Sequence, residues 1–150
     1  MELSFVESKR AVTLLRHLLE LFERYGTPKV IRTDNEPACR SLLFRAVLRL
    51  LGVRHLRTAP FAPWQNGRIE RLFGTVKRVL RLRAQGSDRA VVSPEDLGLI
   101  RTWYNHLRPH QNLDGLTPAE AWSGKRMDRR RRPAWYSEWD GLLSGCYWPD

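Results

Sequence analysis

Residues 31–36 read Ile-Arg-Thr-Asp-Asn-Glu, and residues 62–77 read Ala-Pro-Trp-Gln-Asn-Gly-Arg-Ile-Glu-Arg-Leu-Phe-Gly-Thr-Val-Lys. In each stretch, a carboxylate lies at the border of an expected element. Asp34 closes a short apolar run, and Glu70 stands in the first turn of an expected helix. Taken singly, Asp34 is also typical of a turn, and Glu70 is typical of a first helical turn, where the helix dipole favours an acid.

The residues around Asp34 predict alternating strands and helices. Three short strands are expected at 3–6, 29–32 and 53–58, separated by amphipathic helices at 8–25 and 41–51. Ser8 and Ser41 are the expected N-caps of these helices. Because a strand, helix, strand order favours parallel crossover connections, the pattern predicts an α/β sheet.

After the third strand the sequence predicts a loop and then helices. Residues 59–67 contain two prolines and Asn-Gly, which indicate a loop, and helical spacing returns over 68–83. One face of that helix is expected to pack through Ile69, Leu72, Phe73, Val76 and Leu80. The other face is expected to carry Glu70, Gly74, Lys77 and Arg81, since these offsets return to nearly the same angle. Further helices are expected at 93–106 and from Thr117.

Composition favours a phosphate-rich partner. Lys plus Arg number 26 against 16 Asp plus Glu, which gives a formal charge of +10 over 150 residues. The two cysteines, Cys39 and Cys146, are too few for a disulfide framework or a zinc site, which predicts a reducing interior. The apolar runs are short and interrupted by Arg, so we expect no contact with a membrane and a cytoplasmic location.

Two blocks of sequence resemble the catalytic core of DDE transposases and retroviral-type integrases. The first is the pair of stretches quoted above, which is similar to the core signature of insertion-sequence transposases. The second block begins at Trp103-Tyr104-Asn105-His106-Leu107-Arg108-Pro109-His110 and continues to Thr117-Pro118-Ala119-Glu120-Ala121-Trp122. The resemblance covers residues 27–124, and it implies a ribonuclease-H-like fold.

The resemblance implies a role for each matching residue. Asp34 and Glu70 correspond to the second and third carboxylates of the family, which act in catalysis and hold Mg²⁺ or Mn²⁺. Lys77 resembles the family lysine that binds the DNA end, and the less favoured alternative is a solvated surface lysine. We expect Asn66, Lys77, Arg78 and Arg81 to bind DNA, with Asn66-Gly67 open to the alternative of a plain turn. His55, His106 and His110 lack metal-ligand spacing, so structural roles are expected for them.

The family also requires an upstream Asp, and residues 1–33 contain none. The expected architecture is therefore a ribonuclease-H-like fold lacking its first strands, followed by helices and a basic, Trp-containing tail. We expect residues 1–86 to be the C-terminal part of the core, 87–124 a helical segment and 125–150 the tail. In the tail, Arg129–Arg132 could contact a DNA backbone or be solvated and partly disordered. Its tryptophans, Trp135, Trp139 and Trp148, could cover an apolar surface of this chain or of a partner.

The functional expectation is a transposase or integrase-core protein of DNA integration and transposition that performs metal-dependent phosphoryl transfer. Without the first Asp we expect it to be inactive alone, as an N-terminally truncated recombinase. The alternatives are a DNA-binding or transposase-binding fragment that inhibits without catalysis, or a polypeptide without a role. The expected partners are DNA and either copies of this chain or full-length transposase subunits.

Overall fold

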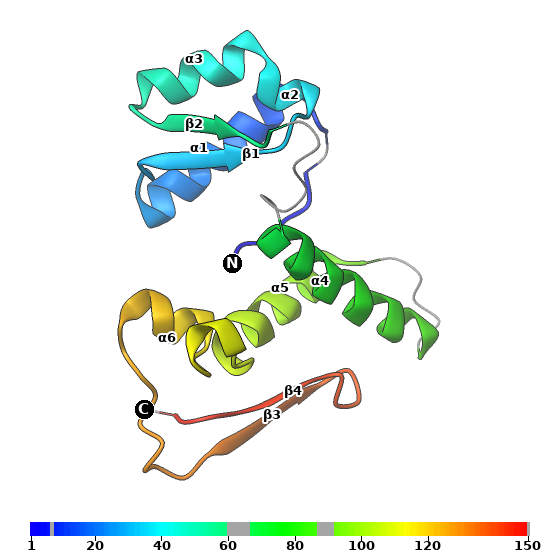
Figure 1. Cartoon of the computed structure of the whole chain (residues 1–150). Coiled ribbons are helices and arrows are strands. Elements are labelled where there is room, and N and C mark those ends of the chain that lie inside the picture. Colours follow the sequence, from blue (N-terminus) through cyan, green and yellow to red (C-terminus); the bar gives the residue numbers. More distant parts are fainter. Residues whose placement is uncertain (7, 60–66, 87–91, 150) are drawn as a thin grey trace. The chain divides into compact units, whose positions relative to one another are not determined.

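The computed structural model describes residues 1–6, 8–59, 67–86 and 92–149 of the chain (Figure 1). It divides into two compact units. One unit contains Val6–Leu72, and the other contains Met1–Phe5 together with Phe73–Asp150. The predicted boundaries near residues 86 and 124 stay a prediction.

The unit of residues 6–72 is a small α/β layer. Its elements are α1 (Ala11–Tyr25), β1 (Val30–Thr33), α2 (Pro37–Arg40), α3 (Leu42–Leu50) and β2 (Arg54–Arg57). β1 and β2 pair in parallel, from Val30 opposite Arg54 to Thr33 opposite Arg57 (Figure 1). The predicted parallel crossover through a helix is confirmed.

Apolar residues at helical spacing hold this unit together. Phe44 and Leu48, one turn apart on α3, are each only 1% exposed and meet Leu15 of α1 and Val53 in one core. Burying side chains of this size stabilises the fold by about 1.5–3 kcal/mol each. Ser41 caps α3 as predicted, because its Oγ accepts a hydrogen bond from Phe44 N at 3.2 Å.

Two sequence expectations at the start of the chain are wrong. The first helix begins at Ala11 rather than Ser8, whose Oγ instead accepts a hydrogen bond from Arg10 N. Residues 3–6 form no strand. Side chains of the 73–150 unit hold the adjoining residues instead: Asn105 exchanges two 2.8 Å hydrogen bonds with Met1, and Arg101 pairs with Glu2. An apolar run becomes a strand only where a neighbouring strand completes its hydrogen bonds.

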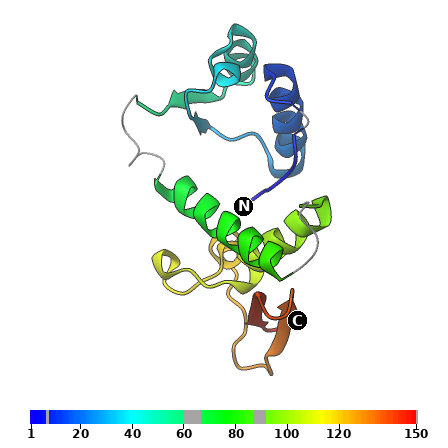
Figure 2. The same cartoon turned by 90° about the vertical axis from the view of Figure 1, so that its right-hand side faces the viewer.

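The second unit is built from helices and a hairpin (Figure 2). Along the chain it holds α4 (Gly67–Gln85, whose first six residues belong to the other unit), α5 (Pro94–Thr102), a π-helical turn η2 (Trp103–Leu107), a 3₁₀ turn (Gln111–Leu113), α6 (Pro118–Ser123), β3 (Ala134–Glu138) and β4 (Leu143–Tyr147). Ser93 and Thr117 each form a capping box with the acid three residues later, which confirms both predicted helix starts.

The packing side of α4 matches the expected one in part, since Val76 is buried and Leu72 and Leu80 are half-buried. Val76 and Val79 are the buried residues, whereas Ile69 is 46% and Phe73 49% exposed. The buried stripe continues to Arg83, whose side chain is only 16% exposed because it pairs with the buried Asp96. The Arg83–Asp96 pair thus extends the buried stripe of α4 beyond its apolar residues.

The C-terminal tail is an ordered antiparallel hairpin over β3 and β4. Leu143 is fully buried, and Trp103 Nε1 donates a 3.0 Å hydrogen bond to Ser144 O, which fastens the hairpin to η2. A Cβ added at Gly145 would lie 3.1 Å from Leu107 O, so the glycine permits this close approach. Residues 134–147 of the tail therefore form a packed hairpin, and both alternatives for Arg129–Arg132 stay predictions.

Candidate active-site and nucleic-acid-binding residues

Asp34 directly follows β1 and is exposed. The backbone on either side of it is fixed by the neighbouring strand: Thr58 N donates to Thr33 O at 2.9 Å, and Asn35 Nδ2 donates to Thr58 O at 2.8 Å. Its own Oδ1 accepts a hydrogen bond from Glu36 N at 3.2 Å. The prediction that Asp34 is presented at the end of a strand is confirmed, and its carboxylate retains free lone pairs for a further ligand.

The side chains behind Asp34 are buried or half-buried. Thr33 Oγ1 lies 2.9 Å from His55 Nε2, and the His55 ring meets Phe44 edge to face. Burial, together with the charges of Arg57 and Arg45, lowers the pKa of His55. Burial also raises the pKa of the Cys39 thiol; a hydrogen bond with Thr33 opposes this, and the charges of Asp34 and Glu36 add to it. Both pKa shifts favour the uncharged forms of the His55 imidazole and the Cys39 thiol, which lie behind the end of β1.

Glu70 occupies the first turn of α4, as predicted. Every residue of the expected chemical face is exposed, namely Glu70, Gly74, Lys77 and Arg81, and Arg78 beside it is exposed as well. α4 thus presents a carboxylate followed by three cations to solvent. Asn66, the remaining predicted DNA contact, lies outside the described residues. The roles of all these side chains stay predictions.

Each carboxylate is positioned by its own element, Asp34 by β1 and Glu70 by α4. Hard divalent cations such as Mg²⁺ prefer oxygen ligands of this kind. Within the described residues no three His, Cys, Asp or Glu side chains come together as a metal site. Asp34 and Glu70 could therefore supply some of the oxygen ligands of such an ion, but these two carboxylates alone do not complete a metal site.

None of His55, His106 and His110 belongs to such a group in the described part of the chain, and their structural roles stay a prediction. His110 stacks edge to face on Tyr104, with ring centroids 4.6 Å apart. Burial and then the charge of Arg108 lower the pKa of His110. His106 is exposed.

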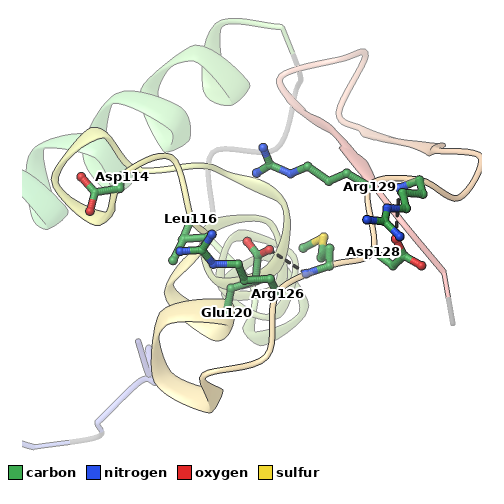
Figure 3. Close-up of a pocket in the computed structure, with 8 residues that line it drawn as sticks. Asp114, Leu116, Glu120, Arg126, Asp128 and Arg129 are labelled. Atoms are coloured by element: carbon green, nitrogen blue, oxygen red, sulfur yellow. Dashed lines mark hydrogen bonds between the residues drawn. The ribbon is translucent and has the colours of Figure 1, made fainter.

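A pocket of about 480 Å³ lies where α6 meets the basic tail (Figure 3). Glu120 is its buried acid, only 5% exposed, and accepts hydrogen bonds from Thr117 N at 2.8 Å and Met127 N at 2.9 Å. Burial alone would raise the pKa of Glu120, but these hydrogen bonds outweigh it and the pKa is lowered. Arg126, Arg129 and Arg130 line the same pocket.

The sequence predicted that Glu120 belongs to a helix start, but it did not predict the hydrogen bond between Glu120 and the tail. Its hydrogen bond to Met127, seven residues on, ties the tail to α6. The Thr-Pro-Ala-Glu spacing was the signal for the cap. The link to Met127 depends on the tertiary path of residues 124–127 and has no counterpart in the local sequence.

Comparison with known proteins gives a consistent result. The Integrase core domain family matches residues 51–118. The Pol-related polyprotein of the mouse intracisternal A-particle MIA14 is 34% identical over 146 residues, which cover 95% of this chain and 16% of that protein. Across five matched curated relatives the chain spans between 6 and 17% of their length.

Solved structures share the fold. The catalytic core domain of BIV integrase superposes with a TM-score of 0.65 at 22% identity, over 82% of this chain and 77% of that one. The HTLV-2 integrase catalytic core domain, solved in complex with magnesium in a trimeric form, superposes with a TM-score of 0.59 at 20% identity, over 79% of this chain and 72% of that one.

Residues 51–118 therefore belong to the Integrase core domain family, and the chain has the ribonuclease-H-like fold of retroviral integrase catalytic cores. The resemblance carried by the two sequence blocks is thereby confirmed. No described helix combines the length and apolar composition needed to cross a bilayer.

Proposed function

We propose that this chain acts on DNA in integration or transposition, with Asp34 and Glu70 as metal-holding carboxylates and the basic face of α4 as a DNA contact. The observation that carries the proposal is the placement of Asp34 at the end of β1 in a fold shared with integrase catalytic cores. The net charge of +10 supports a polyanionic partner.

The reaction class is phosphoryl transfer between DNA strands. A divalent cation held by such carboxylates supplies Lewis-acid stabilisation of the charge on the phosphoryl oxygens. Asp34 and Glu70 would hold Mg²⁺ or Mn²⁺ through their carboxylate oxygens. Lys77, with Arg78 and Arg81 on the exposed side of α4, would bind backbone phosphates and so orient the DNA without reading its sequence.

We propose further that residues 1–150 by themselves do not complete the reaction, because residues 1–33 supply no Asp to serve as the third carboxylate. Weak Mg²⁺ or Mn²⁺ binding without strand transfer is then expected. The same observation favours a second function: a chain that binds DNA or transposase subunits, including copies of itself, and lowers the activity of a complete recombinase. The segment boundaries near residues 86 and 124 and the cytoplasmic location belong to this proposal as well.

A donor-end assay tests the first proposal. Purified chain is incubated with labelled duplex ends and Mn²⁺, and nicked and joined products are resolved on a denaturing gel. We expect DNA binding without products. Products that disappear in Asp34→Asn would show that the 150 residues hold a complete site. Absence of DNA binding at low salt would remove the proposed substrate.

A mixing assay tests the inhibitory function. The chain is added to an active recombinase that cuts and joins the same DNA ends. Product formation should then fall as the concentration of the added chain rises. The matched variant is Lys77→Ala with Arg81→Ala, which removes exposed charge from α4. Inhibition that persists in this variant indicates binding to subunits, whereas its loss indicates competition for DNA.

A further inference from the structure

One segment of the chain carries positively charged side chains and no negatively charged ones. Residues 37–69 contain six arginines, at positions 40, 45, 49, 54, 57 and 68, and no Asp or Glu. The whole chain has 16 acids in 150 residues, so 33 consecutive residues without one are unusual for it. Solvated protein surfaces normally intersperse both signs, since like charges repel one another.

The fold gathers four of these arginines around one groove. Arg45 and Arg49 come from α3, one turn apart and therefore on the same face. Arg54 and Arg57 come from β2. All four are exposed, and the groove between helix and strand has a volume of about 700 Å³. The other residues that line the groove are Leu42, Ala46, Gly52, Val53 and His55, none of which is an acid.

Among the described residues, no Asp or Glu lines this groove. The field reaches the half-buried His55, whose pKa is lowered by burial and then by Arg57 and Arg45. Four guanidinium groups around one concavity raise its affinity for an anion.

We propose that the α3–β2 arginine groove, formed by Arg45, Arg49, Arg54 and Arg57, binds the phosphate backbone of duplex DNA as a contact separate from the α4 face. Guanidinium groups favour phosphate because their planar fork matches two oxygens at once. An open groove with charges on both walls suits a continuous polyanion better than a single small anion. The proposal rests on the proposed function in one respect, namely that this chain handles DNA.

The test measures DNA affinity by fluorescence anisotropy with a labelled 30-base-pair duplex across a salt series. The variant is the pair Arg45→Gln and Arg49→Gln, which keeps helix propensity and removes two charges from an exposed face. If both side chains contact phosphates, the slope of log affinity against log salt should fall by about 1.8, because each contact contributes about 0.9. The loss should be similar for unrelated sequences.

Two controls sharpen the result. Arg10→Gln with Arg16→Gln removes the same charge from exposed positions of the same unit, outside the groove, and should reduce the slope clearly less. Arg45→Lys with Arg49→Lys keeps the charge and should retain the slope. Circular dichroism melting of each variant should match the parent chain, since none of these side chains is buried.

An equal slope change in both glutamine pairs would overturn the proposal, because it would show a diffuse charge effect. Unchanged DNA affinity with lost affinity for a poly-glutamate peptide would also overturn it, in favour of an acidic protein segment. Inorganic phosphate provides a third comparison. If it displaces DNA only as much as any salt of the same ionic strength does, the result supports duplex DNA as the ligand. If it displaces DNA at low concentration, the groove binds a small phosphate and the proposal is overturned. If the parent chain binds no duplex at low salt, the proposed function fails; if the parent chain binds duplex and the groove variant leaves affinity and salt slope unchanged, this inference alone fails.

Discussion

Arg83 on α4 forms an ion pair with Asp96 on α5, and both side chains are largely buried, at 16% and 5% exposed. Asp96 also accepts a 2.8 Å hydrogen bond from Ser93 N, and the Arg83 guanidinium lies 4.4 Å from the centroid of the Trp139 ring. One cation thereby joins α4, the start of α5 and the turn of the C-terminal hairpin. Breaking a buried pair by removing one partner is far more costly than losing an exposed one.

Replacing Arg83 by Ala should lower the free energy of unfolding by about 3–5 kcal/mol, because Asp96 would remain buried without its cation. Urea unfolding followed by circular dichroism measures this. Arg78→Ala, an exposed arginine on the same helix, is the matched control and should change stability by less than about 0.5 kcal/mol. Equal effects of the two substitutions would contradict the importance of the buried pair.

Replacing Glu120 by Gln should destabilise the chain by about 1–3 kcal/mol, since the amide cannot accept all the hydrogen bonds that the carboxylate receives from Thr117 and Met127. The same change at the exposed Glu23 is the control. Hydrogen exchange at the Met127 amide provides a local measurement, and protection there should drop in the Glu120 variant alone. Retained protection would show that another acceptor holds this amide.

Acid should destabilise the second unit through these two carboxylates. For Asp96, burial would raise the pKa, but hydrogen bonds from Ser93 and Arg83 outweigh it, so the folded pKa lies below the ordinary value; Glu120 is lowered in the same sense. Groups with a depressed folded pKa contribute stability that is full above their unfolded pKa, near 4, and is lost as pH falls through the folded pKa. Thermal melting between about pH 6 and pH 2 should show this loss.

The variant Asp96→Asn tests the origin of that acid dependence. It should be less stable than the parent chain at neutral pH and should lose less further stability on acidification. A melting curve with the same dependence on pH as the parent would assign the effect to other groups.

Lys77→Ala should weaken DNA binding for all sequences by a similar factor and reduce the salt slope by about 0.9, if its ammonium contacts one phosphate. Anisotropy titrations at several salt concentrations measure both quantities. Lys29→Ala, another exposed lysine, is the control. Affinity that stays flat between low and physiological salt in the parent chain would argue against backbone contacts altogether.

The sequence alone determined the features that depend on near neighbours. Ser41, Ser93 and Thr117 start their helices as predicted because a capping hydrogen bond involves only three or four consecutive residues. The Thr33-Asp34 border was evident from the end of an apolar run. The apolar spacing of α3 was misleading, because it predicted a packing face of Leu43, Ala46, Val47 and Leu50, whereas Phe44 and Leu48 are buried and Leu43 and Leu50 are 47% and 87% exposed. Family resemblance extended this local information to the ribonuclease-H-like fold.

Tertiary structure decided what depends on distant partners. Residues 3–6 have strand-like composition, yet Asn105 and Arg101 hold the residues beside them, and a strand exists only where another strand accepts its hydrogen bonds. The hairpin of the tail packs against η2 through Leu143 and Gly145, and the buried stripe of α4 includes Arg83 because this side chain pairs with Asp96. The arginines of residues 37–69 are visible in the sequence, but only the pairing of β2 beside α3 places four of them around one groove. Such contacts join residues far apart in the chain, so the stabilisation that they provide cannot be predicted from any short stretch of sequence.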